Sequence, residues 1–213
     1  MANSPLIIRF FTTFAEISFA CLVALPLIHL NKEFPLTEGF AKTKVGNFFV
    51  TKTPYILIVC IALAQCFAYT GLFTQYEILF AIEESLWGLG FVIIIPSALC
   101  HLKNVNKNYK EDPSMKLIKV CLTILCVYTI GYSIYQLGYA LPFNQYAHLS
   151  EDWAKPHLGL REGFKKALFS FTKSRDFDTW GGIGFFIYPS CYFTICTWMN
   201  LTFSLAPRKL IKK

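Results

Sequence analysis

The sequence predicts an all-α membrane protein, a single polytopic domain over residues 1–213 with about five transmembrane helices and one interfacial amphipathic helix. Two observations lead to this prediction. Of the 213 residues, 54% are hydrophobic and only 15% are charged, against roughly 25% charged in a typical soluble domain. The hydrophobic residues also gather in long runs, and nearly all lysines and arginines fall between or after these runs. We therefore expect lipid to cover much of the surface.

Each apolar run is long enough to cross a bilayer, because about 20 helical residues span a hydrocarbon core of about 30 Å. The second helix is expected to begin at Pro54, since proline suits the first position of a helix. Residues 31–53 would then form a hydrophilic loop. The fourth helix is expected to stop at Pro142. The predicted spans are about 6–30, 54–73, 78–100, 115–141 and 183–206.

The connection between the fourth and fifth runs carries an amphipathic pattern over about 157–173. Its apolar residues share one helical face, opposite a charged one, and are Leu160, Phe164, Leu168 and Phe171. This pattern predicts a helix that lies in the plane of the membrane interface. Such a helix either forms a lid or partner-docking element or rests passively on lipid.

The cysteines and sequence motifs give no support to metal or redox chemistry. All eight cysteines lie within apolar runs, and none forms a CxxC pair. A disulfide framework needs cysteines in exposed connections, so these are interpreted as packing residues. The sequence also lacks the HExxH, GxSxG, Walker and dinucleotide-binding glycine motifs. We therefore expect no metal or cofactor, and the sequence leans against an enzyme.

The basic residues indicate an orientation in the membrane. Thirteen of the 20 lysines and arginines fall on the side of the first loop, the third connection and the C-terminal tail. An excess of basic residues is typical of the cytoplasmic side. The N-terminus is thus predicted outside or in the lumen and the C-terminus in the cytoplasm or matrix, in an endomembrane or the mitochondrial inner membrane. Because these residues flank the spans and do not line one face, we expect no nucleic-acid partner.

Polar side chains within the predicted spans are the candidate site, since a charge in hydrocarbon costs about 2.5–3.5 kcal/mol on insertion scales. Alternation of the helices is expected to bring them together in the outer half of the bundle. The four tyrosines among them recur at helical spacing and form one stripe on the fourth helix. The candidate ligand-binding residues are Glu16, Gln65, Glu83, Glu84, Tyr128, Tyr132, Tyr135, Gln136 and Tyr139.

Two interpretations of this polar set remain open. In the first it lines a pocket, open to the outer leaflet or lumen, for a lipid headgroup, a sterol or a small polar ligand. In the second Glu16 pairs with Arg9, and the set joins helices through hydrogen bonds. Glu83 and Glu84 are adjacent and thus about 100° apart around their helix. They are therefore not expected to act as a carboxylate dyad on one ligand.

Three classes of function follow, in decreasing order of preference. The first is a non-catalytic subunit or scaffold of a larger membrane complex, with protein partners in addition to membrane lipids. The second is a lipid- or sterol-binding protein or small transporter that uses the outer-half pocket. The third is an intramembrane lipid-modifying enzyme that uses Glu83 or Glu84 as a general acid or base.

Overall fold

The structure is a computed structural model that describes residues 4–36, 39–146, 149 and 157–169. Over these residues the chain is all-α, as predicted, and four of its helices are long and apolar enough to cross a membrane. The fifth predicted span, 183–206, lies outside the described residues. The elements are α1 (Pro5–Glu33), η1 (Gly39–Lys42), α2 (Lys44–Thr74), α3 (Glu77–Asn108), η2 (Pro113–Met115), α4 (Lys116–Tyr135), the π-helix η3 (Gln136–Gln145) and α6 (Leu160–Phe169).

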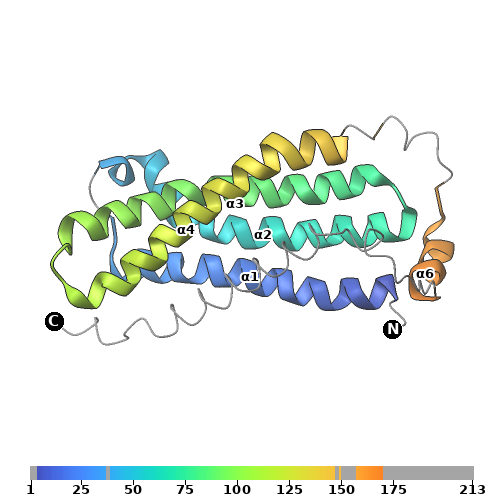
Figure 1. Cartoon of the computed structure of the whole chain (residues 1–213), viewed down its shortest axis with the longest axis horizontal. Coiled ribbons are helices and arrows are strands. Elements are labelled where there is room, and N and C mark those ends of the chain that lie inside the picture. The colour runs from blue at the N-terminus through green and yellow to red at the C-terminus, as the bar shows by residue number, and fades with distance from the viewer. Residues whose placement is uncertain (1–3, 37–38, 147–148, 150–156, 170–213) are drawn as a thin grey trace.

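The four long helices alternate in direction and lie side by side, with α4 crossing the others at an angle (Figure 1). In chain order each packs on the next, α1 on α2, α2 on α3 and α3 on α4. The bundle therefore has two distinct ends. We call them the hairpin end, where α1 begins and α2 turns into α3, and the connection end, which carries the α1–α2 and α3–α4 connections.

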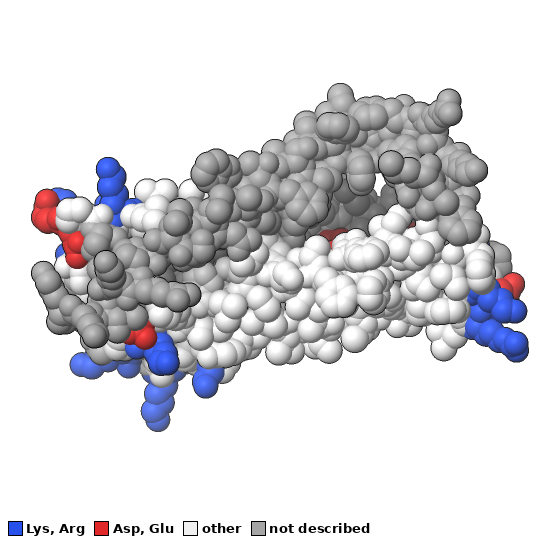
Figure 2. Space-filling model, turned by 90° about the horizontal axis from the view of Figure 1, so that it is seen from below, with Lys and Arg blue, Asp and Glu red and all other residues white. Residues whose placement is uncertain are grey.

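The distribution of charge suits a bundle that crosses a membrane. Figure 2 shows lysine and arginine side chains gathered at the two ends of one face, with a broad and mostly uncharged region between them. Apolar side chains such as Val59, Leu89 and Val127 are exposed along the helices. Water would penalise this exposure, whereas lipid tails solvate such side chains at no cost.

Most of the buried residues of the bundle are apolar. Phe19 and Leu27 of α1, Leu57 of α2, Ile94 of α3 and Leu122 of α4 belong to one buried cluster. α2 and α3 approach closely at Gly90, where a Cβ atom would lie 2.9 Å from Leu57 Cδ1. Small residues at helix contacts let membrane helices approach closely, where dispersion forces hold them.

The predicted start of the second helix at Pro54 is wrong. The helix begins ten residues earlier, at Lys44, where the Thr43 hydroxyl accepts a hydrogen bond of 2.9 Å from the Gly46 amide. Pro54 therefore lies inside α2. It has no N–H to donate to the carbonyl of Val50, four residues before it. That carbonyl instead accepts hydrogen bonds from the Asn31 amide (2.7 Å) and the Ser97 hydroxyl (3.1 Å).

Two other helix ends also differ from the predictions. α3 does not end near Cys100 but continues to Asn108, so its last two turns carry polar residues beyond the apolar run. The helical segment after α4 passes through Pro142 as the π-helix and ends at Gln145, so the predicted stop at Pro142 is wrong. A π-helix has wider turns than an α-helix, and this one begins at the buried Gln136.

Within the range predicted for the amphipathic helix the structure has α6, which lies across the hairpin end (Figure 1). Its buried residues are Gly163 and Ala167. Gly163 lies so close to the Phe73 backbone that a Cβ atom there would collide with the Phe73 carbonyl. The Ser4 hydroxyl donates to the Ala167 carbonyl (3.1 Å). α6 thus fastens the start of α1 to the end of α2.

The apolar stripe predicted for this helix takes little part in that contact. Leu160 is exposed, and Phe164 is exposed apart from a ring contact of 5.6 Å with Phe73. On the charged side, the Lys166 ammonium donates to Gln75 Oε1 (3.0 Å). Residues 170–173 of the predicted helix, including Phe171, lie outside the described residues.

Candidate functional site

Polar side chains from three helices meet near the hairpin end and form what we call the Arg9 network: Arg9, Thr13, Glu16, Gln65, Tyr69 and Glu83. The three residues of α1 share one face because they are spaced by four and three positions. Gln65 and Tyr69 are one turn apart on α2. Gln65 and Glu83 are buried, which places the network inside the bundle.

Arg9 and Gln65 are the central members of this network. The Arg9 guanidinium donates to the Glu83 carboxylate and, over 3.1 Å, to Gln65 Oε1. Gln65 Nε2 in turn donates to Glu16 Oε2 (2.6 Å). Arg9 Nη2 also lies 3.7 Å from that Glu16 oxygen. One cation therefore lies between two carboxylates, and charge-assisted hydrogen bonds of this kind are among the stronger ones in proteins.

Thr13 and Tyr69 extend the network toward the hairpin end of α2. The Thr13 hydroxyl lies 3.1 Å from Gln65 Oε1 and 3.3 Å from Tyr69 Oη. Neither residue is among the candidates predicted from the sequence. Helical spacing would have found them. Thr13 follows Arg9 by four positions and Tyr69 follows Gln65 by four, so each residue shares a helical face with a member of the network.

Glu84 faces a different helix from its neighbour Glu83. Its carboxylate accepts a hydrogen bond of 2.6 Å from Gln136 Nε2, which also lies 3.2 Å from the Glu84 backbone carbonyl. Gln136 approaches this closely because residue 88 is glycine, where a Cβ atom would lie 3.1 Å from Gln136 Cγ. The two adjacent carboxylates thus join α3 to different neighbours, Glu83 to α1 and Glu84 to the π-helix.

The four predicted tyrosines do not act as one stripe. Tyr128 and Tyr132 turn inward, where their ring centroids lie 5.9 Å and 4.9 Å from that of the buried Phe91. Tyr135 and Tyr139 are 47% and 54% exposed. The structure therefore brings Glu16, Gln65 and Glu83 together and pairs Glu84 with Gln136, while Tyr135 and Tyr139 lie on the exposed side of their helices.

A second polar cluster, at the connection end, was not predicted. His101 is fully buried, and its Nε2 lies 2.7 Å from Asn31 Oδ1. Asn31 and Ser97 are the residues that donate to the Val50 carbonyl left free by Pro54. A proline within a membrane helix, followed by a search for nearby amides and hydroxyls, is the signal that would have found this cluster.

Neither cluster gathers the ligands of a metal site. Within the residues that the structure describes, no three His, Cys, Asp or Glu side chains lie where one ion would reach them. No family model matches the chain, and neither a curated protein nor a solved structure matches it.

Proposed function

We propose that the chain is a non-catalytic integral membrane subunit that contributes a firmly held helix bundle to a larger membrane complex. The observation that carries this proposal is the pairing of polar side chains with one another across the spans. Arg9 joins Gln65 and Glu83, and Gln136 joins Glu84. Removing one partner of a buried ion pair costs about 3–5 kcal/mol, so such contacts fix the helices relative to one another and favour a structural role.

The surface we assign to a partner is the N-terminal half of α1. Phe11 and Phe14 are 66% and 59% exposed, and the Phe10 ring makes edge contacts with both, at centroid distances of 5.6 Å and 5.0 Å. By helical spacing these rings lie on the side of α1 away from Arg9. Aromatic side chains bury a large area with few rotatable bonds, which suits them to protein interfaces.

Purification of the tagged full chain in a mild detergent tests this function. We expect another membrane protein to co-purify at a fixed stoichiometry, measured by quantitative mass spectrometry. The Phe11→Ala/Phe14→Ala variant should lose that protein while the Tm of the purified chain stays the same. Val127→Ala/Ile134→Ala is the matched control, because both of its residues are 68% exposed on α4.

Two outcomes would contradict the proposal. The first is a lone, monodisperse chain after native purification. The second is equal loss of the co-purifying protein in both double variants, which would mean that α1 has no special part in the contact.

We also propose that the connection end faces the cytoplasm or matrix and that the N-terminus lies outside or in the lumen. The argument is the excess of lysines near that end, where α1 finishes, α2 begins and α3 finishes. They are Lys32, Lys42, Lys44, Lys103, Lys107 and Lys110. Lysines and arginines within short connections oppose translocation across the membrane.

A further inference from the structure

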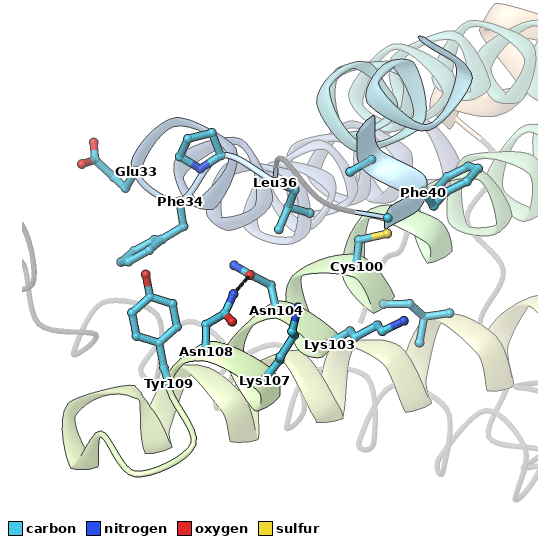
Figure 3. A pocket seen from close by; sticks show the side chains of 14 residues that line it. Glu33, Phe34, Leu36, Phe40, Cys100, Lys103, Asn104, Lys107, Asn108 and Tyr109 are labelled. Atoms are coloured by element: carbon cyan, nitrogen blue, oxygen red, sulfur yellow. Dashed lines mark hydrogen bonds between the residues drawn. The ribbon is translucent and has the colours of Figure 1, made fainter. Parts of the chain in front are cut away.

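A cavity of about 530 Å³ opens at the connection end, between the α1–α2 connection and the last turns of α3. Figure 3 shows its side chains, with Phe34 and Tyr109 facing one another at one end. Their ring centroids are 5.6 Å apart in an edge-to-face arrangement. Pockets of 300–1,000 Å³ are typical of small-molecule sites. This cavity lies far along the bundle from the Arg9 network and is separate from it.

One wall of the cavity is apolar and the other is cationic. Leu36, Phe40 and Leu99 supply the apolar part, and Phe40 and Leu99 are themselves exposed to the surroundings of the bundle. Lys103 and Lys107 supply the charge, and they share a face of α3 because they are four residues apart. The cavity is therefore amphipathic, with apolar side chains on one side and ammonium groups on the other.

Amide groups complete the polar wall. Asn104 and Asn108 lie one position after each lysine, and Asn108 Nδ2 donates to Asn104 Oδ1 (2.6 Å). The hydrogen bond holds the two amides together beside the lysines (Figure 3). Ammonium groups and side-chain amides are donors to phosphate oxygens. The polar wall thus has the donors that a phosphate group requires.

The charge around the cavity also favours an anion. Among the described residues that line it, Glu33 is acidic, and its carboxylate points away from the two lysines in Figure 3. Lys42, Lys44 and Lys110 lie on neighbouring segments and are exposed. The cavity also lies where α3 passes from its apolar run into polar residues, which is the depth of lipid headgroups.

We propose that this cavity binds the headgroup of an anionic phospholipid from the leaflet at the connection end. The phosphate would lie between Lys103 and Lys107, and the acyl chains would follow Phe40 and Leu99 toward the bilayer centre. Free phosphate shares the headgroup's chemistry but has nothing to place against the apolar wall. The lipid site is independent of the proposed role as a complex subunit.

Native mass spectrometry of the full chain in detergent tests this site. Phosphatidylglycerol, phosphatidylcholine and the soluble sn-glycerol phosphate are added in turn, and the occupancy of the first bound molecule is measured. We expect phosphatidylglycerol to bind in preference to the other two. Lys103→Ala/Lys107→Ala should weaken it roughly 30-fold, from about 1 kcal/mol for each lysine near an anionic headgroup.

A matched variant separates a built site from general attraction between opposite charges. Lys52→Ala/Lys119→Ala removes the same charge from exposed positions on α2 and α4 that do not line the cavity. It should bind phosphatidylglycerol as the parent chain does. Both variants should keep the Tm of the parent chain in lipid-free detergent, because all four lysines are exposed.

Three results would overturn the proposal. Equal weakening by both double variants would mean that net charge alone attracts the lipid. Equal occupancy by phosphatidylcholine would remove the role of the lysines. Displacement of the lipid by equimolar sn-glycerol phosphate would assign the cavity to a soluble phosphate ester. None of these results depends on whether the chain co-purifies with another protein.

Discussion

At the residue scale, Gln65 of α2 makes several hydrogen bonds to α1. Its amide oxygen accepts from Arg9, and its amide nitrogen donates to Glu16. A single neutral side chain thus links the cation to a carboxylate on the same face of α1. Glutamine can do this because its amide group is both a donor and an acceptor.

We predict that Gln65→Leu destabilises the bundle by about 1–3 kcal/mol, the usual cost of leaving buried hydrogen-bonding groups unsatisfied. The substitution keeps the approximate size of the side chain but removes its hydrogen bonds to Arg9, Thr13 and Glu16. Its effect is measured as a lower Tm of the purified chain in detergent. Cys66→Ala, at the exposed neighbouring position, is the control and should leave the Tm almost unchanged. A similar loss in both variants would argue against a special role for the network.

The sequence was sufficient to group Glu16, Gln65 and Glu83, because alternating helices bring residues of similar depth to the same level. It was not sufficient to place the tyrosines. Thr129 and Ser133 mark the buried face of α4, and Gln136 continues it into the π-helix, whereas Tyr135 and Tyr139 are exposed. Small and polar residues mark contacts between membrane helices better than aromatic ones do. The spacing of Thr129, Ser133 and Gln136 was therefore a better guide to the buried face than the spacing of the tyrosines.

At the element scale, α6 depends on a glycine for its close approach to the bundle. Gly163 lies against the Phe73 backbone, and a methyl group at this position would meet the Phe73 carbonyl. A backbone atom cannot move aside as a flexible side chain can. Substitution of Gly163 is therefore expected to push α6 away from the end of α2.

We predict that Gly163→Ala separates α6 from the hairpin end and speeds limited proteolysis around α6 several-fold. Gly159→Ala is the matched control, because a Cβ atom there would have no atom within 4 Å. The measurement is the rate of cleavage by trypsin at Arg161, Lys165 and Lys166, all of which are exposed. Equal rates in the two variants would show that the contact does not hold α6 in place.

The start of α2 illustrates which element boundaries the sequence could not give. Lys44 and Lys52 are polar enough to suggest a loop, and Pro54 suggests a first turn. The helix forms through this region because Thr43 caps it and because two other helices supply donors to the Val50 carbonyl. Those donors, Asn31 and Ser97, are distant in the sequence, so no local pattern indicates them.

At the scale of the whole molecule, the number and order of the first four spans followed from hydrophobic run length alone, and the structure has four long apolar helices in that order, with bounds that differ as described above. Run length works because the bilayer thickness sets a minimum number of helical residues. It carries no information about which end faces which compartment. That question rests on the lysines of the connection end.

We predict that the connection end is inaccessible from outside the cell or from the lumen. Single cysteines placed at Lys42 and Lys110, in a chain without its natural cysteines, should resist a membrane-impermeant maleimide until the membrane is permeabilised. A cysteine at Arg161 on α6 should react without permeabilisation. Replacing Lys103, Lys107, Lys110, Lys116 and Lys119 by glutamine should yield a mixture of both orientations. Labelling of the cysteine at position 42 in intact vesicles would reverse the assigned orientation.

The connection between α2 and α3 consists only of Gln75 and Tyr76, and this has a consequence for biosynthesis. So short a turn gives α2 no means of settling in the bilayer while α3 remains outside it, so we expect the translocon to release the two as a unit. α1 leaves the ribosome before them, and Arg9 precedes Glu83, its carboxylate partner on α3, by 74 positions. Until α2 and α3 arrive, the Arg9 guanidinium lacks the Glu83 carboxylate and is best accommodated among lipid headgroups. We therefore expect α1 to reach its final depth after its neighbours.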